Sequence, residues 1–278
     1  MDKYSLFTLE LFSDFLDNYA DSITKEDIKR ICELGFSKEY AFALLICTMY
    51  NLDINENKMW FNEYLLPSIK CLEEKKYINN PYYKNIKIHK KLNNKWTLKW
   101  DKYKDYQAFV YDDFYEKEGK VLFNIGFFEK EFLFPAIYEN DRLWMSITPN
   151  EIETMEKSIN DACGDVLVLG LGIGYYPYML SLKENVKSIT IIEKSKEAIE
   201  LFINEIYPQF TNKIVNVIEM DAFQYLENID TKINYIFADL WHDVSDGKDL
   251  YLKIKQYEKN YQMIKFSYWI EDTIKYYL

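Results

Sequence analysis

A regular alternation of strand-like and helix-like segments after Asp161 constrains the fold of this chain more than any other feature. Such alternation predicts a parallel sheet with helices on both faces, because parallel strands need long crossover connections. Short, nearly all-apolar segments such as "VLVL" (166–169) and "YIFA" (235–238) fit strands that are buried on both faces. The expected strands are 165–170, 187–193, 214–219, 234–239 and a fifth within 263–270, and the expected helices are 175–183, 195–206, 221–227 and 247–260.

The first 116 residues are predicted to form a mainly helical N-terminal domain. Residues 4–20 and 24–50 have helical patterns, and the second breaks into a hairpin at Gly35. Thr24 followed by Asp27 resembles a capping box, and Ser37 can cap the second helix of the hairpin. A further helix is expected over 55–76, with a kink at Pro67.

Residues 117–278 are predicted to form the second domain, which begins with β-hairpins. The stretch "VLFNIGFFEKEFLFPAIYENDRLWMSI" (121–147) alternates in hydropathy and has turn signals at "EKE" and "END". "TPNEIETMEKSI" then begins a helix, with Thr148 as its cap, proline at the first position and Glu151 in the first turn.

Composition restricts the class of protein and its partners. A net charge of −11 over 278 residues argues against extensive wrapping of nucleic acid. The start, "MDKYSLFTLELF", does not look like a secretory signal, and apolar runs such as "AFALLICTMY" are too short to cross a bilayer. Four scattered cysteines and two histidines indicate reduced thiols in a cytoplasm and predict no metal site. The oligomeric state is left open.

One basic segment stands out in this acidic chain. Residues 70–104 contain 11 lysines and three acidic residues, a local charge of +8, and tyrosines and tryptophans are interleaved with them. Lysines with stacking aromatics could bind single-stranded nucleic acid. The alternative, which we favour, is a solvated segment whose aromatic side chains anchor it to the core.

A glycine cluster ends the first strand of the alternating region. Only 8 glycines occur in the chain, and Gly170, Gly172 and Gly174 stand at alternate positions in "VLVLGLGIGY". Glycines let a ligand approach the backbone, and the N-terminus of the next helix adds free N–H groups with about half a positive charge. In a doubly wound sheet this carboxyl edge is where ligands bind.

The next three strands each end in an acidic residue: Glu193, Asp221 and Asp239. Glu193 lies 23 residues beyond Gly170, where a carboxylate can hold both hydroxyls of a ribose, while Asp221 and Ala222 follow the third strand beside a plausible adenine position. The spacing is GxGxG, whereas the dinucleotide fingerprint needs a glycine where Tyr175 stands. Carboxylates attract a cationic ligand and repel a pyrophosphate, so they argue against a dinucleotide.

These motifs resemble the class I S-adenosylmethionine-dependent methyltransferases, over residues of about 160–270, and are most similar to the spermidine synthase-like branch. The stretches that carry the resemblance are "VLVLGLGIGY", "IEKS", "MDAF" and "ADLWHD", preceded by the hairpin region. The resemblance implies a Rossmann-like fold, ribose binding by Glu193, adenine binding near Asp221 and an action of Asp239 on a substrate amine. Ile173 stands where the synthases have a loop acid, and His242–Asp243 replaces an Asp-Pro pair.

Three functions remain open at this point. The first is a methyltransferase that uses S-adenosylmethionine and a small or medium-sized acceptor, with Asp239 and His242 as candidate catalytic residues. The second is an aminopropyltransferase that uses decarboxylated S-adenosylmethionine. The third is a cofactor-binding protein without catalysis. Trp241, beside His242, could stack on a cationic ligand or pack in the core.

Overall fold

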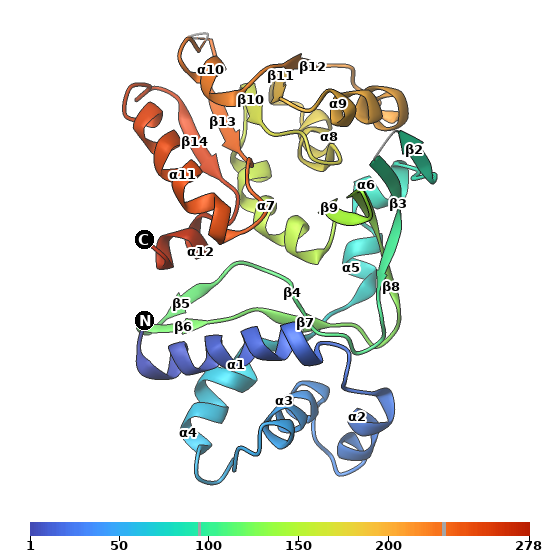
Figure 1. The fold of residues 1–278 in the computed structure, drawn as a ribbon, viewed down its shortest axis with the longest axis vertical. Coiled ribbons are helices and arrows are strands. Elements are labelled where there is room, and N and C mark those ends of the chain that lie inside the picture. Colours follow the sequence, from blue (N-terminus) through green and yellow to red (C-terminus); the bar gives the residue numbers. More distant parts are fainter. Residues whose placement is uncertain (94–95, 230–231) are drawn as a thin grey trace. The chain divides into compact units, whose positions relative to one another are not determined.

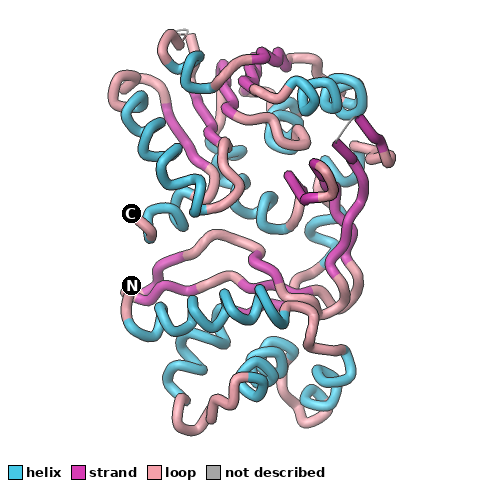
Figure 2. The backbone as a smooth tube through the Cα atoms, viewed as in Figure 1, coloured by secondary structure: helices cyan, strands magenta, loops and turns pink. Residues whose placement is uncertain are grey.

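The computed structural model describes residues 1–93, 96–229 and 232–278 and divides into two compact units (Figures 1 and 2). Unit 1 comprises residues 1–76 and 102–133, and unit 2 comprises residues 77–101 and 134–278. This division differs from the expected boundary between residues 116 and 117. The chain leaves unit 1 after residue 76 and returns at 102, so each unit is built from two separate pieces of sequence.

Unit 1 begins with capped helices, and two of the caps, at Thr24 and Ser37, were predicted. Asp2 accepts hydrogen bonds from the amides of Tyr4 and Ser5, and Thr24 and Asp27 form the expected capping box. Ser37 caps the second helix of the hairpin through the amide of Tyr40. The helices of this unit are α1 (Lys3–Tyr19), α2 (Lys25–Cys32), α3 (Lys38–Met49) and α4 (Lys58–Trp60).

The single kinked helix expected over 55–76 is wrong. After α4 the chain widens into a π-helical turn, Phe61–Leu65, and then tightens into a 3₁₀ turn, Leu66–Ser68. Pro67 lies in that 3₁₀ turn and has no N–H group to continue a helical ladder. The chain therefore leaves the helix and enters strand β1 (Ile69–Cys71).

The strand pairing in unit 1 differs from the sequence-based prediction at one turn. β7 (Ile125–Phe127) pairs in parallel with β1 and antiparallel with β4 (Phe109–Val110), and no pairing joins it to β8 in the described chain. The expected hairpin at "EKE" is therefore wrong, because the chain changes sheets there. A hairpin that we did not predict joins β5 (Tyr115–Lys117) to β6 (Lys120–Leu122).

Unit 2 contains the predicted parallel sheet. Five strands pair in the order β12-β11-β10-β13-β14, and each pairing is parallel. β10 lies at the centre, so the chain winds outward in one direction and then returns to wind in the other. This confirms the doubly wound α/β fold. The strands are β10 (Gly164–Leu169), β11 (Val186–Glu193), β12 (Val215–Glu219), β13 (Tyr235–Ala238) and β14 (Lys265–Tyr268).

Helices connect these strands and cover both faces of the sheet (Figure 1). Right-handed crossovers place α8 and α9 on one face and α10 and α11 on the other. After α9 the chain forms a π-helical turn, Phe202–Ile206, and a 3₁₀ turn that contains Pro208. The helices are α7 (Pro149–Asp161), α8 (Tyr175–Ser181), α9 (Lys196–Leu201), α10 (Ala222–Leu226), α11 (Val244–Glu258) and α12 (Glu271–Tyr276).

A four-stranded sheet of order β2-β3-β8-β9 precedes the parallel sheet. The hairpin expected at "END" is confirmed: β8 and β9 are antiparallel, and Asn140 and Asp141 both have positive φ, as a tight hairpin turn requires. The strands of this sheet are β2 (Lys91–Asn93), β3 (Trp96–Tyr103), β8 (Phe132–Glu139) and β9 (Arg142–Ser146), and the short helices α5 (Glu74–Ile78) and α6 (Pro81–Asn85) come before them.

Among the described residues, none of the helices has the length and hydropathy of a membrane span.

The aromatic side chains of the basic segment are used mainly for packing. Tyr77, Tyr82 and Trp96 are at most 2% exposed, so their faces cannot stack on nucleotide bases. Trp100 is 38% exposed, and its indole N–H donates to the Ile88 carbonyl at 3.1 Å. The contacts of these four side chains agree with anchoring to the core.

Candidate functional site

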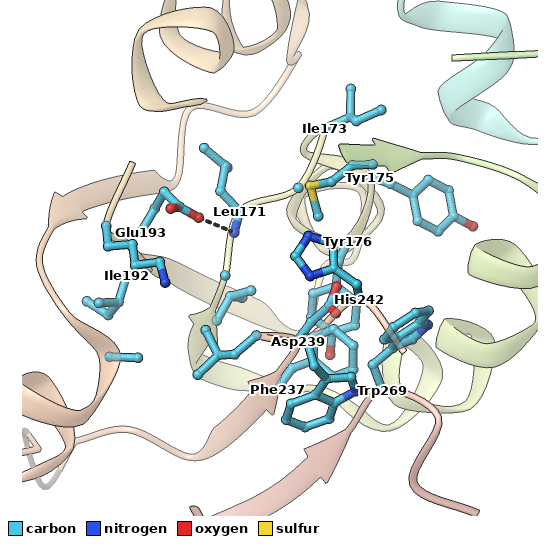
Figure 3. Close-up of a pocket in the computed structure, with 18 of the residues that line it drawn as sticks. Leu171, Ile173, Tyr175, Tyr176, Ile192, Glu193, Phe237, Asp239, His242 and Trp269 are labelled. Atoms are coloured by element: carbon cyan, nitrogen blue, oxygen red, sulfur yellow. Dashed lines mark hydrogen bonds between the residues drawn. The ribbon is translucent and has the colours of Figure 1, made fainter. Parts of the chain in front are cut away.

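A cavity of about 290 Å³ opens at the carboxyl ends of the parallel strands, as the doubly wound topology requires (Figure 3). Its volume is close to the lower end of the range of about 300–1,000 Å³ that is typical of small-molecule sites. All of its lining residues belong to unit 2. Seven of the eight residues that the sequence singled out contribute to the wall: Gly170, Gly172, Glu193, Asp221, Ala222, Asp239 and His242.

The first glycine lets two strand ends meet. Gly170 has φ of +97°, and a Cβ atom placed on it would lie 2.0 Å from the carbonyl oxygen of Asp239. The end of β13 therefore lies directly against the end of β10, and the Asp239 amide also donates to the Leu169 carbonyl at 2.9 Å. A side chain at position 170 would push Asp239 out of the cavity wall.

Gly174 is the sequence-predicted residue that does not line the cavity. It occupies the N-cap of α8 with φ of +74°, and a Cβ atom there would lie 2.5 Å from the ring of Phe202. The glycine is thus explained by close packing of α8 against the segment that follows α9. The expectation that Gly174 itself faces a ligand is not met by this geometry.

Glu193 connects the end of β11 to the glycine loop. One carboxylate oxygen accepts from the Leu171 amide at 3.2 Å, a bond drawn in Figure 3, and the other accepts from the Ser195 amide at 2.7 Å. A carboxylate has about four acceptor positions, so two remain for hydroxyl groups of a ligand. The geometry provides an oriented, hydrogen-bonded anion at the position expected for ribose.

Asp221 has a structural role besides its place in the cavity wall. It is the N-cap of α10, and one of its carboxylate oxygens accepts from the amides of Phe223 and Gln224 at 2.9 and 3.2 Å. The cap turns the chain sharply after β12 and brings the backbone of buried Ala222 to the cavity. The predicted adenine position thus offers backbone and a partly used carboxylate.

Asp239 and Glu151 form the most strongly perturbed part of the site. Burial, together with the nearby charge of Glu193, raises the pKa of Asp239 to about 7. Burial also raises the pKa of Glu151 well above its usual value, and the charge of Asp239 contributes to the rise. Among the described residues, neither carboxylate forms an ion pair with a basic side chain. The pair therefore lacks a cation.

Glu151 was not predicted as a site residue. It lies in the first turn of α7, where an acid is favourable beside the positive end of the helix dipole. From the sequence, Glu151 was therefore explained as a residue that stabilises the helix start. The structure shows in addition that this turn faces the cavity. The signal that could have revealed it is the position of "TPNE" immediately before the parallel sheet, because a helix there can reach the strand ends.

The ionisable side chains that line the cavity are predominantly acidic. Among the described lining residues, Lys194 and His242 are the only two that can carry a positive charge. A cationic ligand would be attracted to this wall, and a polyanion would be repelled. The carboxylates are Glu151, Glu193, Asp221, Asp239 and Asp246.

His242 lies at the cavity with a carboxylate partner. Its Nδ1 is 3.1 Å from an oxygen of Asp246, and its ring meets the edge of Trp144 with centroids 4.5 Å apart. Nε2 is therefore the nitrogen that could face a ligand. Neighbouring Trp241 is 5% exposed and packs against Gly247, whose missing Cβ would lie 2.8 Å from the indole, so packing accounts for much of its environment.

Aromatic side chains form the rest of the wall near Asp239. The rings of Tyr176 and Phe237 stack with centroids 3.9 Å apart, and Trp269 lines the same cavity (Figure 3). Aromatic faces combined with carboxylates favour organic cations, because both are attracted to positive charge. No group of three or more metal-ligating side chains occurs within residues 1–93, 96–229 and 232–278.

Comparison with known proteins gives partial matches to solved structures. No family model and no curated protein matches the sequence. The crystal structure of spermidine synthase from Thermotoga maritima is 14% identical with a TM-score of 0.35, and covers 48% of this chain and 49% of that chain. A spermidine synthase in complex with the transition-state analogue AdoDATO is 14% identical with a TM-score of 0.38, and the match covers 48% of this chain and 50% of that chain. The chain thus matches about half the length of each, and the Rossmann-like fold rests on its own strand order.

Proposed function

We propose that this chain is an S-adenosylmethionine-dependent methyltransferase whose acceptor carries an amine. One observation carries the proposal: consecutive strands β11, β12 and β13 each deliver an acidic residue to a single cavity, beside a glycine loop. Three acids in register along the carboxyl edge match a ligand that extends across the strand ends and is positively charged at one point.

The residues at the ends of β11 and β12 would hold the adenosyl group. The remaining acceptor positions of Glu193 suit the two ribose hydroxyls, because the Leu171 and Ser195 amides already fix the orientation of its carboxylate. The backbone of Ala222 and the side chain of Asp221 would lie beside the adenine. Charge-assisted hydrogen bonds of this kind contribute about 1.5–3 kcal/mol each.

Asp239 and Glu151 would receive the acceptor amine. When bound, S-adenosylmethionine supplies an electrophilic methyl group on a sulfonium, and the sulfur keeps the electron pair of the broken S–C bond. The amine lone pair forms the new N–C bond, and a carboxylate of the pair can accept the proton that the nitrogen loses. With a pKa of about 7, Asp239 is suited to accept a proton near neutral pH.

Aminopropyl transfer from decarboxylated S-adenosylmethionine is the second candidate. The acidic wall favours it, because a cofactor that retains its carboxylate needs a donor or cation, and the described lining offers Lys194 and His242 for that purpose. The decarboxylated form has no such requirement. The two candidates share the adenosyl site and differ in the group that is transferred.

Titration calorimetry tests the proposal with three ligands: S-adenosylmethionine, its decarboxylated form and NAD. We expect micromolar binding of at least one sulfonium compound and much weaker binding of NAD, whose pyrophosphate would meet the carboxylates. Tighter binding of the decarboxylated form would favour aminopropyl transfer. Preferential binding of NAD, or binding of none of the three, would contradict the proposal.

A further inference from the structure

The glycine loop, residues 170–174, is supported by a segment that lies about 90 residues earlier in the chain. The hydroxyl of Tyr82, in α6, donates to the carbonyl of Ile173 at 2.6 Å. Tyr82 is 0% exposed, and burial raises the pKa of its hydroxyl, so the proton that makes this bond is retained. This segment belongs to the basic stretch that the sequence left without a clear role.

Two further side chains of α6 and its cap reinforce the contact. Asn80 donates to the Tyr175 hydroxyl at 3.0 Å, and Asn85 donates to the Tyr178 hydroxyl at 2.9 Å. The ring of Tyr82 meets the edges of Tyr175 and Tyr178, with centroids 5.8 and 5.4 Å away. α6 is thus bonded to the last part of the loop and to the first turns of α8.

The peptide group between Ile173 and Gly174 is held at both of its ends. Its carbonyl accepts from Tyr82, and its amide, on Gly174, donates to the Leu171 carbonyl at 3.1 Å. The preceding amides of Gly172 and Ile173 have no acceptor among the described residues. They lie in the part of the loop that lines the cavity. Fixing the last peptide restricts how these two N–H groups can point.

We propose that Tyr82 is a positioning residue for ligand binding: it holds the glycine loop so that the amides of Gly172 and Ile173 stay available to a ligand in the cavity. Identifying that ligand as an S-adenosyl compound rests on the proposed function. The support of the loop does not, because it follows from contacts within the ligand-free chain. Loss of the hydroxyl would leave the Ile173 carbonyl buried without its donor.

The test compares Tyr82→Phe with a matched control, Tyr251→Phe. Tyr251 is 3% exposed, does not line the cavity, and donates a hydrogen bond of 2.8 Å to Glu271. Hydrogen–deuterium exchange of the ligand-free protein is measured first. We expect several-fold faster exchange in peptides that cover 170–176 in Tyr82→Phe, and no such change in Tyr251→Phe.

Calorimetry with S-adenosylmethionine then tests the link to binding. We expect about tenfold weaker binding for Tyr82→Phe, equivalent to about 1.4 kcal/mol, and less than twofold change for the control. Asn80→Ala, a milder change at a half-buried site, should weaken binding about threefold and serves if Tyr82→Phe does not fold. Unchanged exchange in the loop, or equal weakening in both tyrosine variants, would overturn the proposal. If the wild-type protein binds no adenosyl compound, the proposed function fails, and exchange alone decides whether Tyr82 holds the loop.

Discussion

The two ends of the cavity contain the same kind of residue in opposite environments. At one end, the carboxylate of Glu193 accepts from two backbone amides, which orient it and compensate its charge. At the other end, Asp239 and Glu151 are half-buried: desolvation raises the pKa of both, the charge of Asp239 adds to the rise at Glu151, and the charge of Glu193 adds to the rise at Asp239. The first carboxylate is satisfied by the fold, and the second pair is not.

This difference indicates how the work of the site is divided. A hydrogen-bonded carboxylate of fixed orientation suits recognition of neutral hydroxyl groups, which need direction more than charge. A half-buried pair without a cation gains most from a ligand that brings one, because the repulsion within the pair is then relieved. Glu193 would therefore bind the ribose hydroxyls, and the Asp239–Glu151 pair would bind a positively charged group of the ligand.

The largest change in ligand affinity should come from neutralising Asp239 and Glu151 together. At pH 8, above the pKa of about 7 of Asp239, the double variant Glu151→Gln with Asp239→Asn should bind S-adenosylmethionine about 30-fold more weakly, since the negative charge that the pair then carries, worth about 2 kcal/mol toward a sulfonium, is lost. The affinity for S-adenosylhomocysteine, which lacks the sulfonium charge, should change less than threefold. Calorimetry with both ligands measures the two values. Equal weakening of the charged and neutral ligands would remove the assigned role of the pair.

A smaller loss of affinity is expected when Glu193 is changed, and it should be equal for the charged and the neutral ligand. Glu193→Gln should weaken S-adenosylmethionine and S-adenosylhomocysteine alike, by about tenfold, because the ribose is common to both. Glu219→Gln is the matched control: it pairs with Glu193 in register on β12, is exposed and does not line the cavity. The ribose assignment is wrong if Glu193→Gln and Glu219→Gln bind both ligands equally well.

The smallest effect concerns stability in the absence of ligand. The pKa of Asp239 is raised in the folded state, so folding stabilises its protonated form, and that stability is lost as the pH rises through about 7. Asp239→Asn should therefore raise the free energy of unfolding by about 1 kcal/mol at pH 8, or roughly 2 °C in Tm, and have little effect at pH 4. Thermal unfolding at both pH values checks this. A variant that is less stable than wild type at pH 8 would show that Asp239 is compensated by the fold.

The parallel sheet could be predicted from the sequence because local periodicity alone specifies it. Buried strands and their crossover helices repeat at regular spacing, and acids at the ends of successive parallel strands must meet at one edge. Glu193, Asp221 and Asp239 were found for this reason. The hairpin at "END" was found because two consecutive turn residues interrupt alternating strands.

Other features depend on contacts that sequence spacing does not reveal. Glu151 looked like an ordinary acid at a helix start, and its role in the cavity follows from where α7 points. Tyr82 supports a loop about 90 residues away, and no local pattern relates the two. The "EKE" turn was misread because a local turn signal does not say whether the next strand pairs back or joins another sheet. Pro67 was read as a kink, although a strand begins two residues later.

A crystal structure with bound S-adenosylhomocysteine tests the central claim most directly. We expect the ligand to lie across the ends of β10, β11 and β12, with both ribose hydroxyls within hydrogen-bonding distance of Glu193 and the adenine beside Ala222. The ligand's sulfur should lie at the end of the cavity where Asp239 and Glu151 meet. An empty cavity at saturating ligand, or a ribose directed away from Glu193, would contradict the account.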